Sequence, residues 1–221
     1  MNSPSIENYL KAIFSLTEDA SKKEASTSSI AEFLETKSSS VTDMLQKLDK
    51  KGLVNYKKYK GANLTKKGRD ISVNTIRKHR LWEVFLVEKL GFKWDQIHDI
   101  AEQMEHIQSP ELTDRLDQFL ECPKFDPHGD PIPDKEGNIK HHSSAINLID
   151  LKKGKKASIV GVNDSSDEFL RYLEKHHLGL GVKVTMIEVF DFDQSISINT
   201  AKSKEISLSA MAARNIIVKL D

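Results

Sequence analysis

Three side chains in one short segment have the types and the spacing of a metal site: Glu102, Glu105 and His106. Steps of three and four residues place side chains on one face of an α-helix, so these groups would form a stripe about one turn long. Carboxylate oxygens and imidazole nitrogens are ligands that divalent cations take in proteins. The stripe therefore predicts a site for one metal ion.

A second set of metal-ligand types lies upstream. His79 and Glu83 form an i, i+4 pair, and His98 lies two turns before His106. At a rise of about 1.5 Å per residue, His98 is too far from His106 to share its ion, so two sites are expected. Any one such pair is usually a solvated helix face, but the coincidence of five or six favours metal binding.

Enzymatic metal chemistry is the alternative, and the motifs argue against it. The zinc-protease pattern H-E-x-x-H is missing from the sequence, and the inverted pattern H-x-x-E-H has Glu102 where its first His would stand. A di-iron site needs Glu-x-x-His on two helices. No nucleophile or Gly-rich phosphate loop accompanies the ligands. We therefore expect a metal sensor that is not an enzyme, and keep a metalloenzyme for an anionic substrate as the alternative.

Charge is segregated along the chain although 33 Lys and Arg balance 33 Asp and Glu. Residues 47–69 hold nine Lys or Arg and one Asp, and nine minus one gives +8. Residues 73–141 hold nine Lys or Arg and fourteen Asp or Glu, and nine minus fourteen gives −5. A basic segment of this density predicts phosphate contacts, and the acidic one suits cation binding. The alternative for each is a solvated face.

The first 65 residues have the pattern of a winged helix-turn-helix. An apolar stripe from Ile6 to Phe14 predicts a first helix, and a capping box starting at Ser29 predicts a short second one. A third helix would begin near Ser39 and end before Gly52. Residues 53–57 and 62–65 read as two strands joined at Lys60 and Gly61, which is the pattern of a wing.

The start of the third helix and the wing are the predicted DNA-binding surface. Residues at the N-terminus of a recognition helix reach base edges, and lysines hold phosphates. Capping and solvation are the alternative role of the short polar side chains. A winged-helix regulator that needs no metal is the alternative for the whole protein. The candidates are Lys37, Ser39, Ser40, Thr42, Asp43, Lys47, Lys57, Lys58 and Lys60.

Three further helices are expected, at 65–90, at 94–108, and from Ser109 onward. Their apolar residues exceed what three short helices bury internally, so we expect a homodimer through this region.

A Pro- and Gly-rich connection follows Cys122, and we expect its His128, His141 and His142 to be solvated. From about residue 151 onward, strand-like segments at 157–162, 182–189, 195–198 and 216–220, with a helix at 168–175, predict a small barrel.

The remaining sequence features point to an intracellular protein. No apolar run approaches the roughly 20 residues that span a bilayer, and the start of the chain lacks the layout of a secretion signal. We expect a cytoplasmic protein without membrane contact. The single cysteine, Cys122, cannot form an internal disulfide and is expected to be structural or merely tolerated.

Five segments together resemble the diphtheria-toxin-repressor family of metal-dependent transcriptional regulators, including its manganese-responsive branch. They are Glu7 to Phe14, Leu64 to Gly68, Arg77 to Glu83, Glu102-x-x-Glu105-His106, and Cys122-Pro123 with Gly129 to Pro133. The resemblance covers essentially the whole chain. It implies a mainly α fold with small β elements: a winged helix-turn-helix at 1–72, a helical metal-binding and dimerisation domain at 73–142, a linker at 143–151, and an SH3-like (FeoA-like) domain at 152–221.

The resemblance also implies two ligand sets. The primary site would use Asn8, Glu102, Glu105 and His106. The ancillary site would use His79, Glu83 and His98 with Asp164, or less securely Asp167, from the C-terminal domain.

The family also implies which metal would bind. Some manganese sensors carry Glu at position 11 and build a two-ion cluster, which Lys11 argues against. Iron-type members place Cys at position 102, so the oxygen-rich set here favours Mn²⁺, with Fe²⁺ as the alternative.

The carboxylates crowded in this site should repel one another while it is empty. Binding of the cation would offset this repulsion and shift the homodimer toward operator binding.

Overall fold

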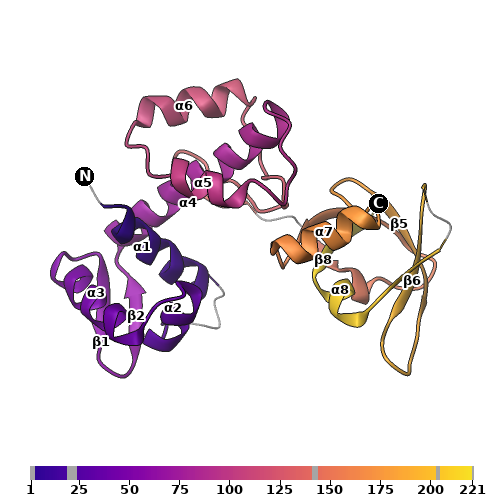
Figure 1. Cartoon of the computed structure of the whole chain (residues 1–221), viewed down its shortest axis with the longest axis horizontal. Coiled ribbons are helices and arrows are strands. Elements are labelled where there is room, and N and C mark those ends of the chain that lie inside the picture. Colours follow the sequence, from indigo (N-terminus) through magenta and orange to yellow (C-terminus); the bar gives the residue numbers. More distant parts are fainter. Residues whose placement is uncertain (1–2, 19–23, 141–143, 203–204, 221) are drawn as a thin grey trace. The chain divides into compact units, whose positions relative to one another are not determined.

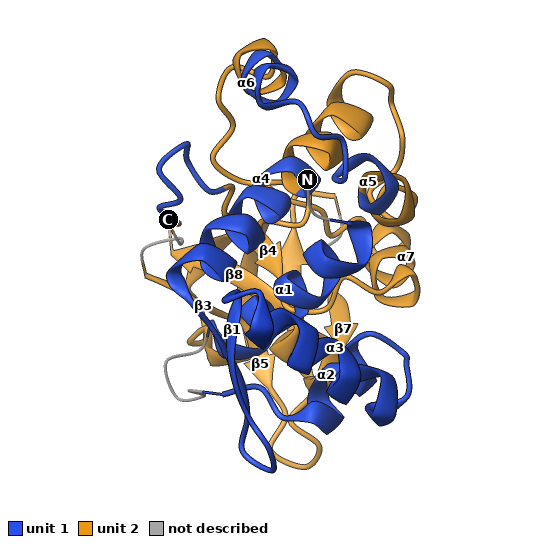
Figure 2. Ribbon diagram, turned by 90° about the vertical axis from the view of Figure 1, so that its left-hand side faces the viewer, with its two compact units in different colours: residues 1–79, 102–115, 133–138 blue, residues 80–101, 116–132, 139–221 orange. Residues whose placement is uncertain are grey.

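The computed structural model describes residues 3–18, 24–140, 144–202 and 205–220 (Figure 1). The chain divides into two compact units (Figure 2). Unit 1 comprises residues 1–79, 102–115 and 133–138, and unit 2 comprises residues 80–101, 116–132 and 139–221. Each unit has its own structure, and the two are described separately.

Unit 1 contains the predicted winged helix-turn-helix. Its elements are α1 (Pro4–Thr17), α2 (Thr27–Phe33), α3 (Ser38–Lys50) and the hairpin of β1 (Val54–Lys57) with β2 (Gly61–Leu64). The second helix begins earlier than the capping box predicted, because Ser26 is the N-cap and accepts a hydrogen bond from the Ser29 amide at 3.0 Å. Apolar faces of the three helices and the hairpin form one core: Ile6, Leu10, Ile13, Ala25, Ile30, Ala31, Val41, Leu45, Leu48, Leu53, Val54 and Ala62.

Gly61 closes the wing against the rest of this domain. Its φ of +115° is open to glycine and strained for other residues, and an added Cβ would lie 2.4 Å from the carbonyl oxygen of Ala25. The backbone of Ala25 bridges to Ala62 on the second wing strand. The glycine therefore lets the segment before α2 pack directly on the hairpin, which fixes the wing relative to the helices.

Three more helices follow: α4 (Lys66–Glu88), α5 (His98–Met104) and α6 (Pro110–Phe119). The predicted single helix over 94–108 is wrong at both ends, because α5 has only 7 residues and ends before Glu105 and His106. These two residues lie in the turn that follows. Their buried contacts, described below, outweigh the local preference for a longer helix, as tertiary context often does.

The C-terminal part of unit 2 is a six-stranded antiparallel sheet in the order β3-β8-β4-β5-β6-β7. The strands are β3 (Ala145–Asn147), β4 (Lys156–Val162), β5 (Lys183–Val189), β6 (Ile196–Thr200), β7 (Ile206–Leu208) and β8 (Ile216–Leu220), with helices η1 (Leu148–Asp150), α7 (Asp167–Lys175) and α8 (Ala210–Arg214). The four predicted strands and α7 are confirmed. The short β3, β7 and α8, of three to five residues, escaped prediction because they are too short for a periodic pattern.

The Pro- and Gly-rich loop after Cys122 packs on this sheet. An added Cβ on Gly129, whose φ is +90°, would lie 2.1 Å from the carbonyl oxygen of Val160. Val162 donates its amide to the carbonyl of His128 at 3.0 Å. His128 is only 4% exposed, so the expectation of a solvated histidine is wrong for this residue. His141 and His142 lie outside the described residues.

No helix within the described part of the chain is both long and apolar enough to cross a membrane.

Candidate metal centre

Glu102, Glu105 and His79 bring ligand atoms within 4.8 Å of one another in unit 1. Glu105 is fully buried, and its Oε2 lies 2.6 Å from Nδ1 of His79. The same His79 nitrogen lies 3.8 Å from Oε2 of Glu102. His79, which the resemblance assigned to the ancillary set, thus also approaches these two carboxylates through its Nδ1. Since an ionised carboxylate oxygen only accepts, Nδ1 of His79 donates to Glu105, and the two carboxylates are the groups here that can ligate a divalent cation.

His106 joins this cluster from the turn after α5. Its Nε2 lies 3.8 Å from Oε1 of Glu105, and its Nδ1 lies 2.7 Å from Oε2 of Glu7. An ionised carboxylate oxygen only accepts, so Nδ1 donates to Glu7, which leaves Nε2 as the nitrogen that can ligate a cation. Gln108 holds the other Glu7 oxygen through a 2.8 Å hydrogen bond. An imidazole oriented through its second nitrogen by a carboxylate is the usual arrangement of a metal-binding histidine.

The first helix supplies three residues to this region. Glu7 is 3% exposed, Asn8 follows it, and Lys11 lies one turn after Asn8 on the same helix. The carbonyl oxygen of Asn8, Oδ1, is buried and has no hydrogen-bond partner among the described residues. A buried acceptor left without a donor is costly, and a cation would satisfy it. The residues present thus fit a metal ion, with Asn8, Glu102, Glu105 and His106 to hold it and His79 beside them.

Lys11 contradicts the expectation that the carboxylates repel one another. Its ammonium nitrogen lies 2.5 Å from Glu102 Oε2 and 2.9 and 2.8 Å from the two oxygens of Glu105. Burial by itself raises the pKa of Glu105. The hydrogen bond from His79 and the charge of Lys11 lower it by more than burial raises it, so the pKa lies below its ordinary value. Glu105 is therefore held ionised, as a metal ligand must be.

A second group of ligand types lies in unit 2. Glu83, Asp126 and His128 are all buried, and each offers an atom within 4.8 Å of the others. His128 Nε2 donates to the carbonyl oxygen of Trp94 at 3.0 Å, which leaves Nδ1, 3.6 Å from Glu83 Oε1, as the nitrogen that could ligate a cation. The same Glu83 oxygen lies 3.9 Å from Nδ1 of His98. Glu83 can therefore serve a site with either histidine.

In this second group, ionisation of the buried carboxyl of Asp126 is electrostatically costly. Burial, and then the charges of Glu83 and Asp130, raise its pKa well above the ordinary value, although Arg80 and the His128 amide oppose the rise. A cation among these oxygens would offset the cost. Sequence spacing gave no indication of Asp126 and left His128 as a solvated loop histidine, because their loop lacks helical periodicity. The Gly129 motif was the available signal that the loop is packed.

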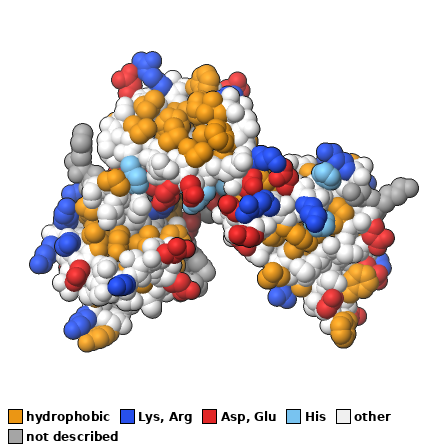
Figure 3. Space-filling view, viewed as in Figure 1, with side chains coloured by type: hydrophobic (Ala, Val, Ile, Leu, Met, Phe, Trp, Pro, Cys, Tyr) orange, Lys and Arg blue, Asp and Glu red, His pale blue; other side chains and the backbone are white. Residues whose placement is uncertain are grey.

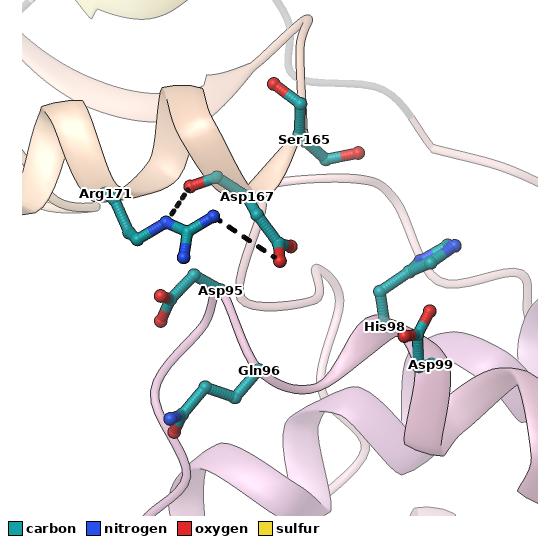
Figure 4. A pocket seen from close by; sticks show the side chains of 8 residues that line it. Asp95, Gln96, His98, Asp99, Ser165, Asp167 and Arg171 are labelled. Atoms are coloured by element: carbon teal, nitrogen blue, oxygen red, sulfur yellow. Dashed lines mark hydrogen bonds and ion pairs between the residues drawn. The ribbon is translucent and has the colours of Figure 1, made fainter.

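His98 also faces the C-terminal domain within unit 2 (Figure 4). A pocket of about 540 Å³ is lined by His98, Asp95 and Asp99 from the α5 side and by Asp167 and Arg171 from α7. Asp164 instead turns to the backbone, and its Oδ1 accepts from the Ser166 amide at 2.9 Å. Asp167 is thus the acidic residue of the C-terminal domain that shares a pocket with His98.

The predicted DNA-binding residues lie on the exposed face of the winged helix. Lys37 is the N-cap residue of α3, and Ser39, Ser40, Asp43 and Lys47 are exposed along it. Thr42 is half-buried, and its hydroxyl donates to the Ser38 carbonyl at 3.0 Å, which occupies it within the helix. On the wing Lys57, Lys58 and Lys60 are exposed.

Helix α6 exposes apolar side chains. Figure 3 shows hydrophobic side chains gathered over α6, where Leu112 is 37% and Phe119 60% exposed. A contiguous apolar patch on the surface is typical of an interaction site. This is the region in which the apolar excess predicted a dimer contact.

A winged helix whose first helix joins α5 and the turn after it in a candidate cation site is typical of metal-binding, DNA-binding regulators. Three family descriptions match the chain: "Iron dependent repressor, N-terminal DNA binding domain" at residues 1–62, "Iron dependent repressor, metal binding and dimerisation domain" at 65–134, and "FeoA domain" at 146–220. The chain belongs to the diphtheria-toxin-repressor family of metal-dependent transcriptional regulators, which are not enzymes.

Individual relatives agree with this assignment. The chain is 36% identical over 168 residues to the HTH-type transcriptional regulator MntR of Oceanobacillus iheyensis, covering 76% of this chain and 100% of that protein. It is 32% identical over 152 residues to the iron-dependent repressor IdeR of Mycobacterium leprae, covering 69% of this chain and 60% of that protein. A solved structure, "Manganese-dependent transcriptional repressor complex with manganese", aligns with a TM-score of 0.85 at 32% identity over 98% of this chain and 100% of that chain.

Proposed function

We propose that this protein is a homodimeric transcriptional repressor that binds operator DNA when Mn²⁺ occupies the site of Asn8, Glu102, Glu105 and His106. One observation carries the proposal: α1, the first helix of the winged helix, supplies Glu7, Asn8 and Lys11 to the cluster that contains Glu102 and Glu105. An ion bound there would attach the DNA-binding helices to α5 and the turn that follows it. It would thereby shift the population toward a form that fits the operator.

Manganese is proposed over ferrous iron because the donors are mostly oxygen. Two carboxylates and an amide carbonyl form a hard ligand set, which suits Mn²⁺ more than a thiolate-containing site would. Fe²⁺ is the alternative ion. We also propose that the protein acts in the cytoplasm, where operator DNA and free metal meet. The targets would be genes of metal-ion homeostasis, since the occupied repressor reports sufficiency of its own ion.

DNA contact is proposed for Lys37, Ser39, Ser40, Asp43 and Lys47 on α3 and for the three lysines of the wing. The exposed start of α3 would read bases, and the lysines would hold phosphates. Thr42 is a weaker candidate, because its hydroxyl is occupied within α3. The dimer contact is proposed to include α6 through its exposed Leu112 and Phe119.

A second ion is proposed at Glu83, which two alternative ligand sets share. One set adds His98 and Asp167, with His79 one turn earlier on α4. In this set the family resemblance places Asp164 where we name Asp167. The other adds Asp126 and His128, which are buried beside Glu83. The buried set has the stronger electrostatic motive, because burial and the neighbouring charges raise the pKa of Asp126, and a cation would favour its ionised form.

A DNA-binding titration tests the proposed function. The full chain is titrated onto fragments of its own promoter region in Mn²⁺ and in chelator, with Glu105→Ala compared with Glu188→Ala, an exposed carboxylate paired with Lys153. Wild type and Glu188→Ala should bind much more tightly in Mn²⁺, and Glu105→Ala should lose the difference. Equal affinity of the wild type in Mn²⁺ and in chelator would refute metal dependence.

A further inference from the structure

Lys11 occupies the oxygens that a metal ion would take. Its ammonium nitrogen lies within 2.9 Å of three carboxylate oxygens, one from Glu102 and two from Glu105. Its side chain is only 14% exposed, so water has little access to screen these contacts. The geometry is that of an ammonium held by two carboxylates in a partly buried place.

A divalent cation and this ammonium cannot both sit among these oxygens. An ion ligated by these oxygens at about 2.0–2.3 Å would lie next to Nζ, which is itself within 2.9 Å of them. Two positive groups at such separation also repel strongly where solvent is limited. Metal binding therefore requires Lys11 to give up its contacts with Glu102 and Glu105.

Lys78, another cation near the cluster, does not share this position. The ammonium of Lys78 lies 4.0 Å from Glu7, whose carboxylate already holds His106 and Gln108. Lys78 therefore neighbours the group that orients His106, whereas Lys11 contacts proposed ligands directly. The competition with the metal falls on Lys11.

We propose that Lys11 is an internal competitor for the metal: it neutralises Glu102 and Glu105 and must be displaced when the ion binds, which raises the metal concentration needed for activation. This rests on the proposed function, since it assumes that Glu102 and Glu105 ligate the ion. Lys11 thereby tunes the sensor. It also keeps the carboxylates from repelling one another, so the fold tolerates a site built for a cation.

The test measures Mn²⁺ affinity directly. Isothermal titration calorimetry is run on a parent variant, the full chain carrying Glu83→Gln, which weakens the proposed second site. The parent is compared with the same chain carrying in addition Lys11→Met, Lys11→Gln, Lys11→Arg or Lys153→Met. Methionine keeps the length of Lys11 without its charge, glutamine serves if methionine impairs folding, and arginine keeps the charge. Lys153 is an exposed lysine paired with Glu188 and serves as the matched control. Circular dichroism confirms folding of each variant.

Loss of the charge should tighten Mn²⁺ binding about tenfold, a figure set below the full Coulomb value because the site is partly screened. The Lys11→Arg and Lys153→Met variants should show no tightening. In chelator, the uncharged Lys11 variants should unfold at a lower temperature than their parent, and saturating Mn²⁺ should remove the difference.

Two outcomes overturn the proposal in distinguishable ways. If the parent binds Mn²⁺ and folded Lys11→Met and Lys11→Gln bind it no more tightly, Lys11 does not compete and only this inference fails. If neither the parent, the wild type nor any Lys11 variant binds Mn²⁺, the proposed metal site fails together with it.

Discussion

Nδ1 of His106 donates to Oε2 of Glu7 at 2.7 Å, which links the turn after α5 to α1 across 99 positions of sequence. Glu7 is 3% exposed, and its other oxygen accepts from Gln108. The carboxylate thus fixes both the ring orientation and the tautomer of His106, which leaves Nε2 for a ligand. A residue that was unremarkable in the sequence holds a proposed metal ligand in place.

Glu7→Gln should therefore weaken Mn²⁺ binding by about 10- to 100-fold, as loss of a carboxylate that orients a ligating histidine does. The amide can still contact the ring but no longer fixes its tautomer. Calorimetric titration of the full chain measures the change, with Glu111→Gln as the control for loss of an exposed carboxylate. Unchanged affinity in folded Glu7→Gln would show that His106 needs no such support.

Glu102→Cys should change metal preference toward Fe²⁺ or Co²⁺, because a thiolate is a softer donor than a carboxylate. The substitution also shortens the side chain, so a loss of affinity for every ion is expected and is not evidence. The measurement is the ratio of activating concentrations of Mn²⁺ and Fe²⁺ in anaerobic DNA-binding titrations. A ratio equal to that of the wild type would remove the main reason for preferring manganese.

The ligand sets proposed around Glu83 predict different losses of bound metal. If Asp126 and His128 hold the second ion, His128→Ala lowers the metal content from two ions to one, whereas His98→Ala and Asp167→Ala leave it at two. The opposite pattern is expected if the ion lies with His98. Metal analysis after equilibrium dialysis at saturating Mn²⁺ decides between them. A count of two ions in all three variants would rule out both sets.

Asp126→Asn should stabilise the protein in chelator at neutral pH. Its pKa is raised in the folded state, mainly by burial, so the native carboxyl holds its proton more tightly than the unfolded chain does. The wild type therefore loses stability relative to Asp126→Asn as the pH rises above the ordinary value of 3.8. Thermal unfolding in chelator at pH 5 and pH 8 should show a larger advantage of the variant at pH 8. An advantage that does not grow with pH would contradict this account.

The wing lysines should contribute to DNA affinity without regard to sequence. Lys58→Ala should weaken binding to operator and unrelated DNA alike, and reduce the slope of log affinity against log salt by about one. Ser39→Ala should instead act mainly on the operator, because this residue lies at the exposed start of α3. Binding titrations at several salt concentrations separate the two effects. A Lys58→Ala slope equal to that of wild type would exclude a phosphate contact.

Local patterns in the sequence determined the helices of the winged helix, its turns and the types of the candidate metal ligands. The spacing of Leu10, Leu45 and Leu48 specified the helices of the winged helix, because one apolar face per helix must be buried. The glycines at 52 and 61 marked the ends of α3 and of the wing turn. Glu102, Glu105 and His106 were recognisable as ligand types from their spacing alone, since ligand chemistry depends on side-chain type.

Tertiary structure decided which atoms meet. The buried position of Glu105 ends α5 early, and it brings His79 and Lys11 to the same carboxylate from helices far away in the sequence. Long-range packing likewise buries His128, in a loop whose sequence reads as solvated. Such contacts depend on how whole elements pack, and no periodicity within one segment records them. Sequence spacing therefore identified the ligand types, whereas the packing of distant segments determined which cation, proton donor or carboxylate each of them faces.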